Sequence, residues 1–345
     1  MIKPNNLFQR LAGNLPGVLL WLAVLPLAAL GQANYATPYT FITLAGKAGN
    51  SGSTDGTNGA ARFHYPCGVA VDNVGNLYVA DGGNNTIREV TPVGTSWVVT
   101  TLAGKAGVTG SADGTNSAAR FDTPAAVAVD TNGNLYVADW NNDTIRKVTP
   151  VGTNWVVTTL AGKAAVTGSA DGTNSAARFD EPDDVAVDSA GNLYVGDSVN
   201  NTTRKVTPVG TNWVVTTLAG KAGVTGSADG TGEAALFSFG DGAGGCVAVD
   251  SAGNLYVTDF SNDTIRKGMP ASSVPPPMLQ PPSLSAGLFG FGITGLPGLA
   301  VNIESSTNLS SWQVTATYIL VGGTNYYSVS PNPAQGAQFY RAHVR

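Results

Sequence analysis

The stretch TNGNLYVADWNNDTIRKVTPVGTNWVVTTLAGK, residues 131–163, decides the fold because close copies of it recur on both sides. Each copy ends in LAGK, and neighbouring LAGK motifs are 58 residues apart; they begin at Leu44, Leu102, Leu160 and Leu218. Self-similarity at one fixed spacing is the signature of a repeat protein, in which each unit buries its apolar surface against the next.

Within one unit the residues alternate with a period of two, as in β-strands. The segments rich in Val, Thr, Tyr and Trp are 127–130, 134–139, 144–150 and 155–162. Turn residues separate them, so each unit is expected to form one antiparallel sheet of four short strands. Such a sheet needs cover on both faces, which neighbouring units provide. The sequence therefore predicts an all-β fold with the blades of a β-propeller.

Residues 121–148 combine a Phe, a Pro and the motifs VAVD and GNLYVAD, and this pattern returns in the other units. It resembles the NHL repeat over roughly residues 39–268. The resemblance implies an NHL-type β-propeller, although relatives usually have about six blades. This sequence shows three complete units and a fourth that lacks its last strand.

The missing strand has a counterpart at the other end of the chain, where residues 34–46 carry a last strand with no strands before it. We expect this N-terminal strand to complete the last blade, because closure buries two open sheet edges. The expected product is a four-bladed ring in a monomer. A ring shared by two chains and an open arrangement remain the alternatives.

Cys67 and Cys246 bear on ring closure because each precedes the first strand of its unit. The first and fourth units are neighbours only in a closed four-bladed ring, where one disulfide could join them. The two cysteines differ in strand parity, so two buried free thiols are the alternative.

The N-terminus has the pattern of a secretory signal peptide: Lys3 and Arg10 precede an apolar run at residues 15–30 that contains Pro16 and Pro26. We expect residues 1–33 to be removed, giving a secreted or cell-surface protein; an uncleaved anchor is the alternative. Cleavage takes the formal net charge of −5 down by two, to −7. An acidic protein without a Lys/Arg stripe is a poor candidate for nucleic-acid binding.

Composition changes after the propeller region, residues 34–269. Residues 270–282 are rich in Pro and predict a semi-rigid linker. Residues 283–345 contain five or six short strands and predict a small Ig-like β-sandwich, with Trp312 and Tyr340 as core anchors. This region is similar to a small C-terminal β domain on exported proteins of environmental bacteria, which implies export or surface display.

The repeats differ from one another mainly in two places, the loop before the first strand and the turn after the second. In an up-and-down sheet these two connections emerge on the same face, so variation gathers where binding loops are usually held. Drift in tolerant loops is the alternative. The candidate ligand-binding residues are His64, Tyr65, Asp122, Trp140, Asn141, Glu181, Asp183, Asp184, Ser198, Asp241 and Phe260.

Trp140 and Phe260 occupy equivalent turns, where the other units have Gly82 and Ser198. Aromatic planes on an Asn-rich face suit stacking on sugar rings or anchoring of a peptide. Packing onto a neighbouring blade is the alternative.

Acidic residues that recur in every unit are expected to be structural. Asp81, Asp139, Asp197 and Asp259 should accept hydrogen bonds from the following turn or pair with Arg88, Arg146, Arg204 and Arg266. For Asp55, Asp113 and Asp171 we expect Arg62, Arg120 and Arg178 as partners. The cluster of Asp180, Glu181, Asp183 and Asp184 could hold Ca²⁺, but a solvated loop is more common, and no cofactor is predicted. The turn at residues 130–134 resembles the start of a calcium loop, but a hairpin turn explains it better.

His64 is the single histidine of the propeller region, and no Ser/His/Asp arrangement or Cys/His metal spacing is present. The sequence therefore favours a non-enzymatic binding module for an extracellular protein, peptide or glycan. Related propellers include lyases and metal-dependent lactonases, and for that alternative His64, Tyr65, Glu181 and Asp184 are the candidates. A fold alone does not specify an activity. A purely structural surface protein is a third hypothesis.

Overall fold

The computed structural model describes residues 40–240, 244–270, 278–285, 288–295, 300–320, 324–330 and 338–344. The predicted signal peptide, residues 1–33, lies outside these ranges. The chain divides into two units, residues 1–42 and 43–345. The described residues form strands and short 3₁₀ turns but no α-helix, and no helix among them has the length and apolar character of a membrane span.

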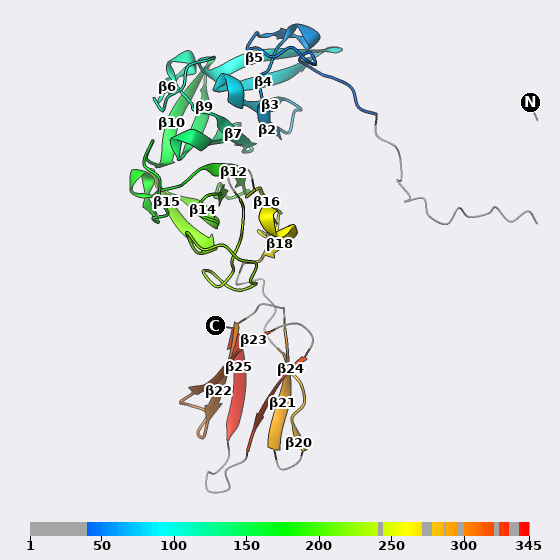
Figure 1. Cartoon of the computed structure of the whole chain (residues 1–345), viewed down its shortest axis with the longest axis vertical. Coiled ribbons are helices and arrows are strands. Elements are labelled where there is room, and N and C mark those ends of the chain that lie inside the picture. Colours follow the sequence, from blue (N-terminus) through cyan, green and yellow to red (C-terminus); the bar gives the residue numbers. More distant parts are fainter. Residues whose placement is uncertain are drawn as a thin grey trace, which may run out of the picture. The chain divides into compact units, whose positions relative to one another are not determined.

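Three five-stranded sheets follow one another along the chain and are named blades 1 to 3 (Figure 1). Blade 1 contains β1 (Gly56–Thr57), β2 (Pro66–Val71), β3 (Leu77–Asp81), β4 (Thr86–Val93) and β5 (Ser96–Gly104). Blade 2 contains β6 (Gly114–Thr115), β7 (Pro124–Val129), β8 (Leu135–Asp139), β9 (Thr144–Val151) and β10 (Asn154–Gly162). Blade 3 contains β11 (Gly172–Thr173), β12 (Pro182–Val187), β13 (Leu193–Asp197), β14 (Thr202–Val209) and β15 (Asn212–Ala219).

The four strands expected in each complete unit are all present, joined by successive antiparallel hairpins. Each blade also has a fifth strand of two residues, such as β6, that pairs with the last long strand. This strand was not expected, because two residues are too few to show a period in the sequence.

Blade 4 is shorter and contains three strands among the described residues, β16 (Val247–Val249), β17 (Leu255–Asp259) and β18 (Thr264–Gly268). Of the N-terminal segment expected to close the ring, residues 34–39 lie outside the described residues. Thr40–Gly46 lie outside any strand, and the Phe41 side chain is 94% exposed. The end of this segment is fastened to blade 1 instead, where the Gly46 amide donates to the carbonyl of Asn58 at 3.1 Å. The four-bladed closed ring therefore remains a prediction.

The turn between the first and second long strands is held by an aspartate in every blade. In blade 2, Asp130 accepts hydrogen bonds from the amides of Asn132 and Asn134, and the Tyr136 hydroxyl donates to it at 3.0 Å. Gly133 supplies the positive φ of +78° that the turn needs. The interpretation of this motif as a hairpin turn is therefore correct.

The turn after the second long strand is a single 3₁₀ turn in three blades and ends in a left-handed residue such as Asp143 (φ +54°). These turns are η2 (Gly82–Asn84), η4 (Trp140–Asn142) and η6 (Phe260–Asn262). Three more short 3₁₀ segments follow the two-residue strands, η1 (Asn58–Ala60), η3 (Asn116–Ala118) and η5 (Asn174–Ala176).

Each blade packs against the next through one hydrophobic cluster. Tyr78 and Ile87 of blade 1 meet Val127 and Leu135 of blade 2, and the same positions recur between blades 2 and 3. The first long strands of successive blades, β2, β7, β12 and β16, contact one another (Figure 1). Gly68 makes this close approach possible, since a Cβ there would lie 2.7 Å from the Cα of Ala126.

The C-terminal region is a two-sheet β-sandwich, as expected. Its core contains Phe291, Ile293, Val301, Ile303 and Leu320. One sheet contains β19 (Met278–Leu279), β20 (Ser283–Ser285), β21 (Leu288–Thr294) and β24 (Thr324–Val329). The other contains β22 (Ala300–Ser306), β23 (Gln313–Ile319) and β25 (Phe339–Val344).

Two expectations for this region need correction. Met278 and Leu279, assigned to the linker, form β19 and pair with β21. Trp312 is not in the core: it is half-buried, and the Arg341 guanidinium lies 4.3 Å from its ring centroid. The position next to the Ser-rich turn places this Trp at the edge of the sandwich, whereas Tyr340 does pack against the core.

Candidate functional site

The two variable connections of each blade lie side by side. In blade 2 the amide of Asn141, in the turn after the second strand, donates to the carbonyl of Asp122, in the loop before the first strand, at 3.2 Å. The equivalent bonds in the other blades join Gly83 to His64, Val199 to Asp180 and Ser261 to Ser238. The loops that differ most between repeats thus form one continuous edge in each blade.

A buried carboxylate at the end of the second strand fixes this pair of loops. Asp139 accepts the Asp122 amide at 2.8 Å, the side-chain amide of Asn142 at 2.8 Å and Arg146 Nη1 at 2.7 Å. Burial raises the pKa of Asp139 to about 6, although the positive charge of Arg146 opposes this shift. The structural role expected for this recurring acid is correct in all four blades.

The second set of recurring acids has different partners from those expected. Asp113 pairs with Arg146 Nη2 at 2.8 Å, and not with Arg120, whose guanidinium donates to the carbonyls of Ser117 and Ala119. One arginine per blade, fully buried in blades 1 to 3, therefore bridges two aspartates. Its guanidinium also lies over a phenylalanine ring, 5.3 Å from the Phe121 centroid in blade 2.

His64 and Tyr65 form the candidate edge of blade 1. Their rings are 4.5 Å apart, and Tyr65 is 75% exposed. His64 Nδ1 lies 3.1 Å from the carbonyl of Gly83, within its own blade. In blade 2, Asp122 and Asn141 are joined by a side-chain hydrogen bond of 3.2 Å. The structure thus brings together two pairs of the candidate residues.

The acidic loop of blade 3 is used mainly for hydrogen bonds within the protein. Asp184 accepts the amide of Val247 in blade 4 at 2.8 Å, and the amide of Glu181 donates to Asp143 in blade 2 at 3.1 Å. Burial raises the pKa of both Asp183 and Asp184. Across the described ranges, no three His, Cys, Asp or Glu side chains are grouped so that they could hold a metal ion.

Asp183 occupies a β-bulge of β12, between the paired residues Pro182 and Asp184. Cys67 and Ala125 occupy the equivalent bulges of blades 1 and 2. A bulge re-aims one side chain out of the regular pleat, so this position varies in chemistry while the strand is kept. Nothing in the repeat pattern alone marks it as a bulge.

The remaining candidates differ widely in exposure. Phe260 is 66% exposed and fits an aromatic platform. Trp140 is half-buried, with its indole Nε1 buried and without a hydrogen-bond partner among the described residues, which agrees better with packing. Ser198 is fully buried and faces no solvent. Asp241 lies outside the described residues.

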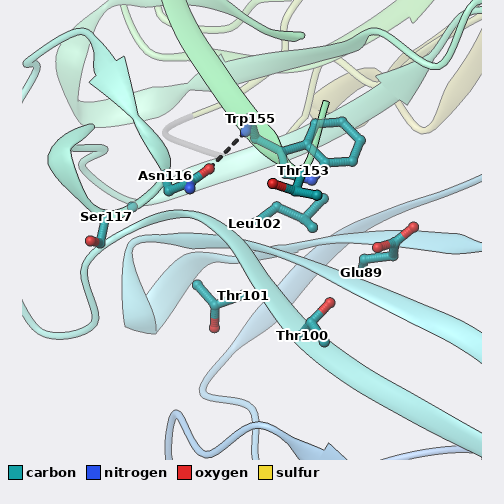
Figure 2. A pocket seen from close by; sticks show the side chains of 9 residues that line it. Glu89, Thr100, Thr101, Leu102, Asn116, Ser117, Thr153 and Trp155 are labelled. Carbon is teal, nitrogen blue, oxygen red and sulfur yellow. Dashed lines mark hydrogen bonds between the residues drawn. The ribbon is translucent and has the colours of Figure 1, made fainter. Parts of the chain in front are cut away.

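The sequence did not indicate two grooves that lie between the outer strands of adjacent blades. One, of about 480 Å³, lies between blades 1 and 2; Glu89, Thr100, Thr101 and Trp155 are among its lining residues (Figure 2). The equivalent groove between blades 2 and 3, of about 510 Å³, has Lys147 in place of Glu89. Figure 2 also shows the Trp155 amide bonded to the side-chain oxygen of Asn116 at 2.7 Å. The Trp and the Thr-Thr pair that recur in the three complete units are the sequence features from which these grooves could have been predicted.

The fold and the repeated edge define a β-propeller protein made of near-identical blades. A family model described as NHL repeat matches residues 63–89 and 121–148. These two stretches are therefore NHL repeats, and the same sequence pattern continues in the third and fourth units.

Similarity to individual proteins covers parts of their length. The chain is 40% identical over 97 residues to Protein SUPPRESSOR OF QUENCHING 1, chloroplastic, of Arabidopsis thaliana; the match covers 28% of this chain and 9% of that protein. An auxiliary nutrient binding protein from Bacteroides ovatus is 21% identical, with a TM-score of 0.46 over 60% of this chain and 48% of that one. A protein of unknown function from Bacteroides thetaiotaomicron is 27% identical, with a TM-score of 0.46 over 58% and 46% of the two chains. The chain thus spans about half the length of these two Bacteroides proteins and less than a tenth of the Arabidopsis protein.

Proposed function

We propose that this NHL-repeat propeller is an exported, non-catalytic binding module that holds an extracellular protein, peptide or glycan at the edge formed by its variable loops. The observation that carries the proposal is the fastening of each loop pair by a backbone hydrogen bond and a buried aspartate, as in Asp122, Asn141 and Asp139. A rigid scaffold lets loop side chains vary without loss of the fold.

The exposed aromatic residues of this edge support the same proposal. Tyr65 and Phe260 are large, solvent-facing side chains on loops whose backbones are held. Aromatic side chains lose little conformational entropy on binding and supply large contact areas to peptides and sugars. Phe260 is the strongest single candidate for contact with a ligand.

Export would place this edge in contact with extracellular partners. The supporting feature is the N-terminal pattern of Lys3 and Arg10 before an apolar run. Mass spectrometry of the protein purified from culture medium and from cell surfaces tests this step, because removal of residues 1–33 leaves a new N-terminus at residue 34.

The binding proposal is tested by screening the purified chain on a carbohydrate array and against a phage-displayed peptide library. Any ligand found is then titrated by calorimetry with the wild type and with Phe260→Ala and Tyr65→Ala. We expect each substitution to weaken binding about ten-fold or more, the usual range for an aromatic hot spot.

Val151→Ala is the matched control, because Val151 is 55% exposed on the β9–β10 hairpin, away from the variable loops. Equal loss of affinity in the control would show that the variable edge is not the binding surface. A ligand whose affinity changes only with Trp155→Ala would place the site in the groove of Figure 2 instead.

A further inference from the structure

The contact between successive blades has two complementary faces. The later blade contributes a valine face, in which Val127 and Val185 are buried to 6% and 4% exposure. The earlier blade contributes a tyrosine face, in which Tyr78 and Ile87 are buried to 4% and 0%. The same contact is formed three times along the chain.

A backbone-to-side-chain hydrogen bond accompanies each of these contacts. The left-handed residue that ends the turn of one blade accepts the amide of a residue in the loop of the next blade. The three bonds join Thr123 N to Asn85 Oδ1 at 2.8 Å, Glu181 N to Asp143 Oδ1 at 3.1 Å and Phe239 N to Asn201 Oδ1 at 2.8 Å.

An aromatic pair also recurs across the blade junctions. The Trp155 ring of blade 2 lies 6.1 Å from the Tyr78 ring of blade 1, in an edge-on arrangement. The Trp213 ring of blade 3 lies 6.0 Å from the Tyr136 ring of blade 2 in the same way. Each junction with a complete following blade therefore carries a Trp–Tyr pair.

Blades 1 and 4 each leave one half of this contact uncovered. On the valine face of blade 1, Val69 is 67% and Val71 61% exposed. On the tyrosine face of blade 4, Ile265 is 72% and Tyr256 39% exposed. Where a neighbouring blade is present, the apolar side chains at these positions are buried or partly buried, as Val127 and Val129 are, so both faces lack their usual cover.

The hydrogen bond of this contact also has its donor residue in blade 1 and its acceptor residue in blade 4. Tyr65 has a φ of +49°, close to those of Thr123 (+53°) and Glu181 (+54°), so its backbone already has the conformation of a donor residue. Asp263, with φ +55°, is the acceptor residue of blade 4. Among the described residues nothing donates a hydrogen bond to its carboxylate. Trp97 of blade 1 stands at the position of Trp155 and Trp213, so it is the Trp that would pair with Tyr256 of blade 4.

We propose that these two faces join head to tail between two copies of the chain, with blade 1 of each copy packed against blade 4 of the other. The contact is the continuation of an interface that the chain already forms three times. A heterologous contact closes into a ring when its rotation allows. Two copies give about eight blades, the upper end of the range in which propellers close. Closure within one chain would cover the same faces, but this structure leaves both uncovered.

The experiment measures the mass of the purified chain by light scattering over a range of concentrations, and we expect twice the chain mass of 35.1 kDa or of its processed form. Val69→Asp and Ile265→Asp each place a charge on an exposed position of one face, so each should give a monomer without loss of the folded circular dichroism spectrum. Val93→Asp is the control, since Val93 is 57% exposed on the hairpin between β4 and β5. It should remain a dimer.

Mixing the two face variants distinguishes a head-to-tail contact from pairing of like faces. The Val69→Asp chain keeps an intact blade 4 face, and the Ile265→Asp chain keeps an intact blade 1 face. The mixture should therefore form a one-to-one complex that neither variant forms alone. If the wild type is a monomer at every concentration, the proposal is wrong. A lower melting temperature of the Val69→Asp variant would not change that conclusion. A wild-type dimer that persists in both variants, or a mixture that stays monomeric, would also overturn it.

Discussion

Arg146 and Asp139 form an ion pair with 2.7 Å between Nη1 and Oδ2, and neither side chain is exposed to solvent. The same guanidinium pairs with Asp113, which is half exposed, at 2.8 Å. Each arginine thus joins the end of the second strand to the loop of the two-residue strand. Because this triad recurs in every blade, its contribution to stability is repeated along the chain.

The substitution Asp139→Asn should lower the free energy of unfolding by about 3 kcal/mol, since it leaves a buried guanidinium with less compensation. Asp113→Asn is the matched control and should cost less than about 1 kcal/mol, because Asp113 itself is half exposed to solvent. Urea denaturation measures both. Burial raises the pKa of Asp139 to about 6, above the unfolded value of about 3.9, so the folded wild type takes up a proton first and the difference in stability between wild type and Asp139→Asn should widen as the pH falls below 6. Equal losses in the two variants would contradict this account of the triad.

Alanine substitutions at two glycines separate the loss of stability caused by close packing from the loss caused by backbone strain. Gly68→Ala should destabilise by about 1–3 kcal/mol, because the new Cβ would lie 2.7 Å from the Cα of Ala126 in the next blade. Gly152 has φ +62° and nothing within 4 Å of the added Cβ, so Gly152→Ala should cost only about 1 kcal/mol. Thermal denaturation of both variants tests the comparison. A larger loss for Gly152→Ala would show that blades 1 and 2 separate more easily than the structure indicates.

Most of the fold could be predicted because its signals are local and repeated. The alternation of VAVD and NLYVAD gives the strands, and the glycine of Asp130–Asn134 gives the hairpin turn. Repetition at one spacing then gives the blades. The candidate edge followed from strand order alone, since hairpins place alternate connections on one side.

The parts that were missed depend on contacts that the local sequence does not contain. Arg62 is nearer to Asp55 in sequence than Arg88, yet Arg88 makes the ion pair because β1 adds to β5 beside β4. Ser198 varies between repeats like a ligand-binding residue, but packing buries it completely. Closure of the ring could not be read from an unpaired strand, because blade number depends on the angle between blades.

The hairpin-turn tyrosines of blades 1 to 3, Tyr78, Tyr136 and Tyr194, have raised pKa values and should titrate at unusually high pH. Burial raises the pKa of Tyr78 to about 12, and the negative charges of Glu89 and Asp72 act in the same direction. The pKa of Tyr194 is likewise raised to about 12 by burial and Asp188. Since the unfolded value is about 10, the folded state favours the neutral phenol. Its contribution to stability is full below pH 10 and is lost as the pH rises through 12. Tyrosinate absorbance should therefore rise late and together with unfolding, and Tyr78→Phe should remove part of the late step. A complete titration near pH 10 in the folded protein would contradict the burial of these rings.

Cys67 and Cys246 are both free and solvent-accessible, so a thiol reagent should find two thiols per chain under non-reducing conditions. Their reaction should be slow at neutral pH, because burial raises the pKa of both thiols and the carboxylates of Asp81 and Asp184 add to the shift at Cys67 and Cys246, respectively. The thiolate is the reactive form, so the rate should continue to rise above pH 9, where that of an unperturbed thiol levels off. Peptide mapping after alkylation assigns each rate to its cysteine. Absence of free thiols together with a peptide that links residues 67 and 246 would contradict this prediction. Mass analysis without reductant would then distinguish a disulfide within one chain from one between two copies.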